Sequence, residues 1–456
     1  MNDTVYDICV IGSGPAGLTL CAELINSGKK ICILESGKKE KTKYADNLKE
    51  IENSGEIEVK TSSRERILGG TSTTWTGLSA PMDEIDLEKW PIKMSELKTY
   101  YEKCNKYGFP EFKDFYTEPS RSSNDSSRNY EKLQEKVFIA NIPAWNFAEK
   151  LKYIFDNQNV ELFTDSTVIK LNSEKINEQS RVTSAVIKKS DGKEYEIFAK
   201  TFVIATGGIE TPRLLLLSNL GNEYDQVGRY IMNHPKKAYG FVHFKKPMKD
   251  LPYFFKKIDK GFSKYSGLRL KDDIQKSLGL LNSYVRFEEV YSWKDKIIHR
   301  LFPWIDIPVK KVRVWNFMEM KALAENRIVL SEKKDTNGIQ IPNVVMNTSN
   351  IDKKSLIELH KTLAEEFEKD GIAVLESNIE KENPWPITTD ASHHIGGTIM
   401  GNDPRNSVVN KDLKVHSISN LYITSSSVFP TSGNANPTYT ICALSIRLAK
   451  KLSGNI

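Results

Sequence analysis

The chain has 456 residues, of which 39% are hydrophobic and 27% are charged, proportions typical of a globular protein with room for two or more hydrophobic cores. A disordered or collagenous chain is therefore excluded. The net charge of +6, from 65 basic and 59 acidic residues, is too small to indicate a nucleic-acid-binding protein.

The sequence contains no apolar run long enough for a membrane-spanning helix, so we expect none. The first residues, MNDTVYDICVIG, begin a strand pattern and lack the basic start, apolar core and cleavage site of a secretory signal, which favours the cytoplasm. The cysteines, Cys9, Cys21, Cys32, Cys104 and Cys442, have no CxxC spacing. We interpret them as small buried hydrophobes and expect neither a disulfide framework nor a metal site.

The N-terminal segment predicts a strand, a tight glycine turn and a helix. The apolar run VYDICVI at 5–11 is followed by Gly12-Ser13-Gly14-Pro15-Ala16-Gly17 and the helical pattern LTLCAELINSG. In such a turn Gly12 permits the sharp bend, Gly14 lets the backbone approach a pyrophosphate, and Gly17 lets the helix pack closely on the strand. The N-terminus of the helix then faces the anion.

A second apolar strand, KICILE, ends on Glu35, eighteen residues after Gly17. A carboxylate at that place can accept hydrogen bonds from both hydroxyls of an adenosine ribose, which indicates a dinucleotide without a 2′-phosphate. Glu35 and its neighbour Ser36 are therefore candidate cofactor contacts. The complete pattern predicts a dinucleotide-binding fold and leaves FAD and NAD both open.

Two further glycine-containing segments are candidates for the same site. The first, RERILGGTSTTW at 64–75, has a Gly-Gly turn, four hydroxyl residues and a Trp, and such a loop can lie flat against a large ring and hydrogen-bond it. The second, at 200–218, is a strand that ends in a Gly pair before a helix opened by Pro212, which brings another turn to the same edge of the sheet. The candidate contacts in these segments are Arg66, Gly69, Gly70, Thr71, Ser72, Trp75, Ala205, Thr206 and Gly207.

The C-terminal segment carries the candidate catalytic groups. His393 and His394 precede a Gly pair, and one of them is a candidate base. Downstream, Asn436 stands at the cap and Pro437 at the first position of a final helix that includes Thr438. The N–H groups of that helix can stabilise negative charge on a reduced ring.

These motifs resemble the glucose-methanol-choline (GMC) oxidoreductases, a family of FAD-dependent alcohol oxidases and dehydrogenases, along nearly the whole chain. Within the family the chain is similar to a short bacterial branch related to pyranose-oxidase-like and sugar dehydrogenase members. The segments that carry the resemblance are GSGPAG at 12–17, RERILGGTSTTW at 64–75, WPIKMSELKTYY at 90–101, FVIATGGIETPRLLLLS at 202–218, VGRYIMNHP at 227–235, ENRIVLSEKKDTNG at 325–338, HHIGGTIMG at 393–401 and NPT at 436–438.

The resemblance implies roles for three residues. It makes His393 the catalytic base and Asn436 the partner that holds the substrate hydroxyl, whereas we ourselves expect His394 to shape the pocket. It also implies that Val168 lies near the adenine.

The chain departs from the resembled family at two positions. Thr74 stands where pyranose oxidases carry a histidine that links to the flavin, so we expect FAD to be bound non-covalently. Ser425 stands where many members have an Asp, so the cofactor contacts expected at Ser425 and Ser426 shift toward backbone N–H groups.

The predicted fold class is α/β, a Rossmann-like FAD-binding domain assembled from discontinuous segments, plus an α+β substrate domain with an antiparallel sheet. We expect residues 1–92, 150–234 and 384–456 to form the FAD-binding domain and residues 93–149 and 235–383 to form the substrate-binding or cap domain. In the cap, NSYVRFEEVYSW, KVRVWNFMEM, NRIVLSE and NVVMNT alternate as strands of the antiparallel sheet.

Other segments carry less specific patterns. The polar stretch at 120–129 indicates a mobile loop, and the lysine-rich stretch at 236–264 favours a solvated loop over a face for phosphate or acidic lipid. IIHRLFPWIDIPV at 297–309 favours core packing under a loop over an element that contacts a membrane surface or admits substrate. His234, in the MNHP stretch, is expected to order a turn.

The expected function is FAD-dependent oxidation of an alcohol group, with His393 as the base. The resemblance favours a sugar or a sugar-like substrate, such as an aminocyclitol, a polyol or a glycan precursor, and oxygen, a quinone or a redox protein all fit as electron acceptor. A redox-neutral flavoprotein, either a lyase or a mutase, is the alternative, and a non-catalytic FAD-stabilised binding protein is a third hypothesis. A disulfide reductase is disfavoured because the chain has neither a CxxC nor a second GxGxxG.

Overall fold

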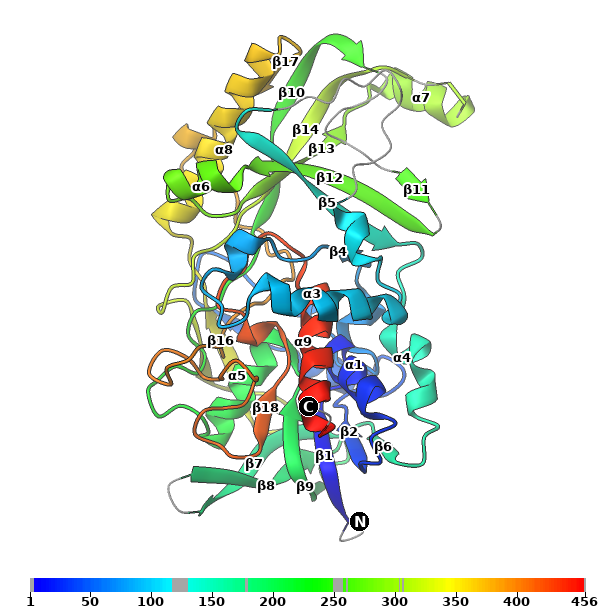
Figure 1. The fold of residues 1–456 in the computed structure, drawn as a ribbon, viewed down its shortest axis with the longest axis vertical. Helices are drawn as coiled ribbons and strands as arrows, with labels where there is room; N and C mark the ends of the chain where they lie inside the picture. The colour runs from blue at the N-terminus through cyan, green and yellow to red at the C-terminus, as the bar shows by residue number, and fades with distance from the viewer. Residues whose placement is uncertain are drawn as a thin grey trace.

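The computed structural model describes residues 4–116, 130–176, 179–248, 257–259, 261–302, 304–305 and 307–454. The polar stretch at 120–129 and part of the lysine-rich stretch at 236–264 lie outside these residues. Figure 1 shows two layered units along the long axis, a mainly parallel sheet with its helices below and an antiparallel sheet above.

The lower unit is built on a sheet with the strand order β6-β2-β1-β9-β8-β7, and β18 pairs with β9. Strands β1, β2, β6, β9 and β18 pair in parallel, whereas β7 and β8 join the sheet in antiparallel pairs. The strands are β1 Val5–Ile11, β2 Ile31–Leu34, β6 Val160–Phe163, β7 Thr167–Ile176, β8 Gln179–Lys188, β9 Glu194–Ile204 and β18 Leu421–Ile423. Side chains of β1 and β2 are almost all buried, as expected for central parallel strands.

Helices α1 Pro15–Leu24 and α9 Pro437–Leu452 lie side by side in front of this sheet in Figure 1, although they come from opposite ends of the chain. Each begins with a proline at its first turn, where the missing N–H is not needed. Helix α5 Gly207–Ser218 follows β9. The discontinuous α/β fold predicted from the sequence is confirmed.

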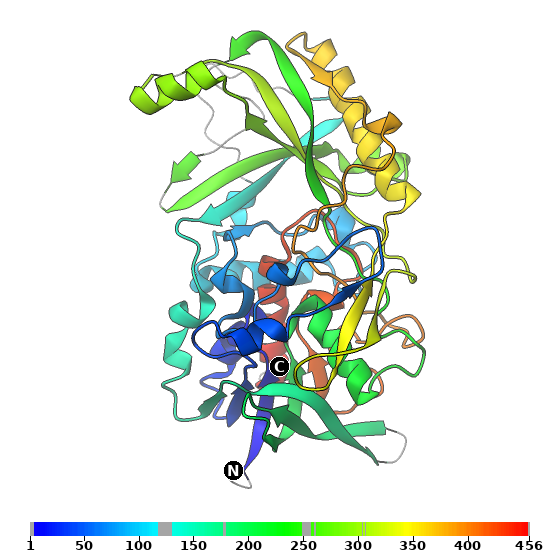
Figure 2. The ribbon, with the colours of Figure 1, turned by 180° about the vertical axis from the view of Figure 1, so that it is seen from behind.

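The upper unit is an antiparallel sheet with the strand order β17-β10-β14-β13-β12-β5-β4, and β11 pairs with β12. Helix α8 Asn350–Lys369 covers one face, where Leu356, Leu363 and Phe367 pack against strand side chains. The opposite face is turned toward the parallel sheet, since Tyr284 belongs to the lower hydrophobic core (Figure 2). The strands are β4 Leu78–Ser79, β5 Leu133–Asn141, β10 Lys236–Met248, β11 Lys257–Asp259, β12 Phe262–Leu270, β13 Tyr284–Glu289, β14 Val309–Phe317 and β17 Ala373–Glu376.

Two predicted strands belong elsewhere. Strands β15 Arg327–Lys334 and β16 Gln340–Val345, expected in the antiparallel sheet, form a separate small sheet with β3 Glu52–Asn53 and pack against α5. Alternation identifies a strand but not its partner, and β3 supplies a parallel partner from near the N-terminus. The remaining helices are α2 Lys43–Asn47, α3 Met94–Lys103, α4 Phe147–Lys150, α6 Asp272–Ser277 and α7 Trp293–Leu301.

The expectation of core packing at 297–309 is wrong. Helix α7 projects from the upper unit in Figure 1 and has no buried residue, and Trp304 after it is 76% exposed. Leu301, Phe302 and Ile305 are also exposed. Among the described residues of this segment only Val309, at the start of β14, packs into a hydrophobic core.

The division into two domains with the stated boundaries stays a prediction. Helix α3, which it assigns to the cap, packs against α9, where the Tyr101 hydroxyl and the Thr440 hydroxyl are 2.7 Å apart. In the part of the chain that the structure describes, no helix is long and apolar enough to cross a membrane.

Candidate functional site

The glycine turn after β1 is fixed by backbone contacts. Gly12 has φ of +105°, and a Cβ there would lie 2.6 Å from the carbonyl oxygen of Ala205 on the neighbouring β9 connection. A Cβ on Gly17 would lie 2.1 Å from the carbonyl oxygen of Gly12. By contrast, a Cβ on Gly14 would meet nothing within 4 Å, because Gly14 borders a cavity. The turn is therefore closed on the protein side and open on the cavity side.

Glu35 at the end of β2 holds this turn. Its Oε2 accepts hydrogen bonds from the Ser13 backbone N–H at 3.1 Å and from the Ser13 hydroxyl at 2.6 Å, and its Oε1 accepts one from the Gly37 N–H at 2.7 Å. Glu35 also lines the cavity beside Ser36 and Val168. The carboxylate therefore fixes the turn and reaches the end of the cavity where the sequence predicts a ribose.

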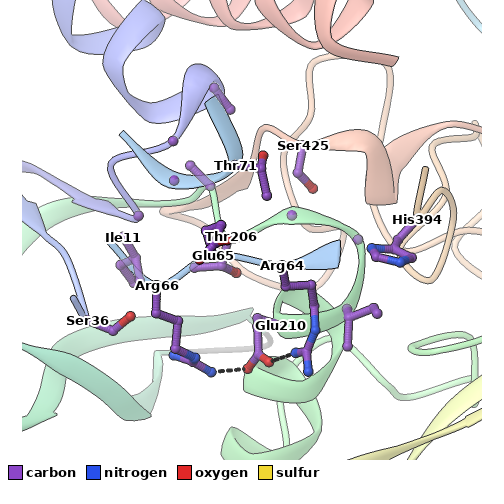
Figure 3. A pocket seen from close by; sticks show the side chains of 18 of the residues that line it. Ile11, Ser36, Arg64, Glu65, Arg66, Thr71, Thr206, Glu210, His394 and Ser425 are labelled. Atoms are coloured by element: carbon purple, nitrogen blue, oxygen red, sulfur yellow. Dashed lines mark hydrogen bonds and ion pairs between the residues drawn. The ribbon is translucent and has the colours of Figure 1, made fainter. Parts of the chain in front are cut away.

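An ion-pair network lines one wall of the cavity (Figure 3). Glu210 pairs with Arg64, with Arg66 at 2.8 Å and with Arg213 at 3.1 Å, and these cations hold the pKa of Glu210 well below its usual range despite its burial. Burial lowers the pKa of Arg64 to about 10. The buried Nε atoms of Arg64 and Arg66 have no hydrogen-bond partner among the described residues.

The loop at 69–75 forms another wall. Ser72 accepts a hydrogen bond from the Phe147 N–H at 3.0 Å, and Trp75 donates from its indole to the Trp145 carbonyl at 2.8 Å. Gly69 has φ of +95° and packs against Asn146, so its glycine is needed for the turn itself. These contacts orient Gly70, Thr71, Thr74 and Trp75 along the cavity.

His393 and Asn436 meet at the other end of the cavity. The Asn436 amide nitrogen lies 3.0 Å from His393 Nε2. The sequence predicts Asn436 as the N-cap of α9, but its side chain makes no capping hydrogen bond. The amide is engaged with the imidazole instead, which corrects the capping interpretation of the side chain.

A second histidine sets the tautomer of His393. His234 Nε2 lies 3.2 Å from the carbonyl oxygen of Ser432, which can only accept, so this nitrogen carries the proton. Burial lowers the pKa of His234 to about 4, so the ring is neutral at pH 7 and its Nδ1 is an acceptor. His393 Nδ1, 2.9 Å away, must then donate to it.

His393 consequently keeps a lone pair on Nε2. Burial is the main cause that lowers the pKa of His393 well below its usual range, with His234 and Lys236 adding to it. The ring is therefore neutral at pH 7, with Nδ1–H directed to His234 and Nε2 free to accept from Asn436 or from a hydroxyl. That arrangement suits a general base.

His394 has a different environment. Its Nε2 lies 3.2 Å from the Ser63 hydroxyl and 3.7 Å from Asp390, whose other oxygen accepts from Asn233 at 2.7 Å. Hydrogen bonds and the nearby His394 hold the pKa of Asp390 well below its usual range in spite of burial. His394 is therefore tied into a buried polar network at the edge of the cavity.

Most of the predicted site residues line this one cavity, but their roles stay predictions. Those along it are Gly12, Ser13, Gly14, Pro15, Ala16, Glu35, Ser36, Arg66, Gly70, Thr71, Trp75, Val168, Ala205, Thr206, Gly207, His393, Ser425, Ser426, Pro437 and Thr438. Gly17, Gly69, Ser72 and Asn436 stand behind them. The Ser425 hydroxyl accepts from the Ser427 N–H at 3.1 Å, so it caps the short helix at 426–428.

Sequence reasoning missed His234, Arg64, Glu210 and Arg213. The MNHP stretch has no catalytic spacing and predicts only a turn for His234, whose contact with His393 spans 159 residues of sequence. The charged groups stood in the quoted segments at 64–75 and 200–218. The two segments carry opposite charges and are both expected at one site. That combination was a signal for an ion-pair network.

Fold and cavity together define a dinucleotide-binding protein with a histidine and amide pair at one end of its site. Residues 6–236, about half of the chain, match the family model of pyridine nucleotide-disulphide oxidoreductase, and residues 322–445 match the model of GMC oxidoreductase. The chain therefore combines a pyridine nucleotide-disulphide oxidoreductase domain with the C-terminal domain of the GMC oxidoreductases. The five cysteines are buried and free, so the first match reflects the dinucleotide-binding fold.

Individual relatives cover part of this fold. The large subunit of fructose dehydrogenase from Gluconobacter japonicus is 30% identical over 61% of this chain and 52% of its own length. Paromamine 6′-oxidase from Streptomyces fradiae is 26% identical over 65% of this chain and 53% of its own length. The chain spans about half the length of these curated relatives. Pyridoxine 4-oxidase from Mesorbium loti has a similar fold, with a TM-score of 0.64 at 15% identity over 98% of this chain and 99% of that one.

These families are flavoproteins, so FAD is the cofactor they imply, and the cavity fits it. Gly14 leaves open space beside the N-terminus of α1, where a diphosphate can approach the backbone. The unpaired buried Nε atoms of Arg64 and Arg66 lack an acceptor that a ligand would supply. The cavity extends from Glu35 to His393, as a two-part ligand requires.

Proposed function

We propose that this protein oxidises an alcohol group on a sugar or sugar-like substrate, with non-covalently bound FAD as its cofactor. The observation that carries the proposal is the neutral His393, whose Nε2 lone pair faces the Asn436 amide at the end of the cavity. An alcohol gives up electrons readily only if its hydroxyl proton is removed. His393 Nε2 takes that proton, and the Asn436 amide donates to the oxygen as its negative charge develops.

The rest of the chain prepares the site for this chemistry. Bound FAD supplies the electron-accepting ring. Glu35, Arg66, the glycine turn and the loop at 69–75 are the residues that would hold it, and Thr74 has no side chain nitrogen through which to attach it covalently. His234 keeps the proton of His393 on Nδ1 of the His393 ring.

The relatives support the choice of substrate class. One is a fructose dehydrogenase and another is a paromamine oxidase, so sugars and sugar-like rings are the substrates to test first. The electron acceptor and a location in the cytoplasm stay predictions.

The test is an anaerobic absorbance titration of the FAD-loaded protein with sugars, polyols and amino sugars. We expect bleaching of the flavin band by at least one compound, and a loss of roughly 10² to 10⁴ in the bleaching rate in His393→Ala, which should stay yellow. His416→Ala is the control, because His416 lies away from the cavity. A protein that takes up no FAD would contradict the proposal, and FAD binding without bleaching would favour the redox-neutral alternative.

A further inference from the structure

The face of the antiparallel sheet that looks toward the parallel sheet carries an ordered set of side chains. Lys236 on β10 lies directly opposite Phe317 on β14, which lies opposite Tyr284 on β13. Directly opposed residues project from the same face, and the rings of Tyr284 and Phe317 stack at 4.5 Å. Since Tyr284 belongs to the lower core, Lys236 projects from the face that looks toward His393.

Arg286 follows Tyr284 by two residues and shares this face. Its guanidinium carbon lies 5.4 Å from the ring centre of Tyr265 and 5.4 Å from that of Phe317. Two rings thus hold the planar cation in one position. Among the described residues Arg286 has no ion-pair partner, and no hydrogen bond from its side chain is formed.

Lys236 is the second cation of this surface. It is two residues from His234, which contacts His393, and within the described ranges its ammonium has no carboxylate partner. Burial lowers the pKa of Lys236, and the nearby Arg286 lowers it further. Lys236 in turn contributes to the lowered pKa of His393.

The acidic groups near these cations are engaged elsewhere. Asp390 accepts from Asn233 and from the N–H groups of Ser392 and Lys60. Glu288 accepts from the Trp315 indole at 2.7 Å and pairs with Arg313 at 3.6 Å. Asp390 raises the pKa of Lys236 through its charge, but among the described residues neither Lys236 nor Arg286 forms an ion pair with a carboxylate.

We propose that Lys236 and Arg286 bind a negatively charged group, a carboxylate or a phosphate, on the alcohol substrate. Two partly buried cations that form no ion pair are unfavourable, since Arg286 lowers the pKa of Lys236, and an anion placed between them removes the repulsion and fills the open fork of the guanidinium. The inference rests on the proposed alcohol oxidation and adds the charge of the substrate. It favours sugar acids or sugar phosphates over amino sugars, although one relative is a paromamine oxidase.

The test compares four versions of one sugar ring on the FAD-loaded protein: glucose, glucosamine, glucuronate and glucose 6-phosphate. Calorimetric titration measures binding, and anaerobic bleaching of the flavin band measures oxidation. We expect at least one of the two anionic sugars to bind at least about tenfold more tightly than glucose, glucosamine to bind most weakly, and the preference to shrink as salt is raised. Tighter binding of glucuronate indicates a carboxylate site, and tighter binding of glucose 6-phosphate indicates a phosphate site.

The variants are Arg286→Gln and Lys236→Met, with Lys237→Met as the matched control. Lys237 is the exposed neighbour of Lys236, and alternation along β10 directs it to the other face. Both test variants should lose the anion preference, whereas Lys237→Met should keep it. Inorganic phosphate is a second probe, expected to bind the FAD-loaded protein and to bind Arg286→Gln at least about tenfold more weakly.

Equal binding of all four sugars, tighter binding of glucosamine, or the absence of binding by both phosphate and the anionic sugars would overturn the inference. Bleaching by a neutral sugar with no anion preference would leave the proposed oxidation standing and remove only the charge assignment. Anion binding that depends on Arg286 without any bleaching would instead remove the proposed oxidation.

Discussion

The two sheets of this molecule shape the site through different kinds of contact. Around the parallel sheet, the glycine turn is fixed by backbone atoms, as Gly17 lies against the carbonyl of Gly12 and Gly12 lies against Ala205. On the antiparallel sheet, the surface above His393 is made by side chains from separate strands, such as Arg286 between Tyr265 and Phe317.

We interpret this difference as a division of tasks. Backbone contacts at the turn suit the binding of a cofactor, and side chains on the sheet face suit the selection of a substrate. Backbone contacts at a tight turn tolerate almost no added atom, so they preserve one geometry for a ligand that does not vary. Side chains on a sheet face can be substituted without disturbing the backbone hydrogen bonds between the strands, so this face can specify a substrate. His393 lines the cavity and also contacts His234, which precedes β10 of the antiparallel sheet by two residues.

The glycine turn gives the largest expected effect. A Cβ in Gly17→Ala would lie 2.1 Å from the Gly12 carbonyl, so the turn must move, and we expect a loss of about 3 kcal/mol or more in the free energy of unfolding, measured by urea denaturation. Gly14→Ala is the control, because its Cβ points into open space. It should leave the apoprotein stable and weaken FAD binding, and equal stabilities of the two variants would refute the backbone argument.

Asn436→Ala should affect rate and not stability. Loss of the amide beside His393 should lower the rate of flavin bleaching by roughly 10² to 10³. The unfolding midpoint should stay nearly unchanged, because this side chain does not cap α9. Ser349→Ala provides the reverse case, since Ser349 caps α8 and its loss should cost about 1 kcal/mol without changing the rate.

His234 is expected to act as a positioning residue. His234→Phe keeps a ring but removes the acceptor for the His393 Nδ1–H, and we expect a fall of roughly tenfold to 100-fold in the bleaching rate. His234→Gln restores an acceptor and should recover part of it, which a purely structural role would not explain.

The dependence of the bleaching rate on pH provides a second test of the protonation state of His393. In the unaltered protein the rate should stay level as the pH falls from 8 to about 6.5, because His393 is neutral there and its pKa lies well below 6.5. A decline with a midpoint at or above 6.5 would contradict the lowered pKa of His393.

The smallest effect is expected on the exposed segment after α7. Trp304 is 76% exposed, so Trp304→Ser should change the free energy of unfolding by no more than about 0.5 kcal/mol. Phe367→Ala, at a fully buried position under the same sheet, should cost about 3 to 5 kcal/mol. A large effect at Trp304 in urea denaturation would indicate that this segment packs against another surface.

Much of the cofactor side was predictable because its signals are local. The spacing from Gly12 to Glu35 encodes one strand, one turn and one helix, and Gly12 and Gly17 each have a steric reason to be glycine. The pairing of β15 and β16 with β3 was not predictable, because alternation identifies a strand but leaves its partner open. The apolar pattern at 297–309 failed for a related reason, since it does not show whether another element covers it.

By itself the sequence determined the α/β fold and the dinucleotide turn, because short-range spacing and turn chemistry carry that information. The candidate pair His393 and Asn436 came from the resemblance to the GMC oxidoreductases. Only the tertiary structure decided that His234 fixes the proton of His393 and that Lys236 and Arg286 share a face above it. Those contacts join residues far apart in the chain, and they depend on strand order and register, which no single segment encodes.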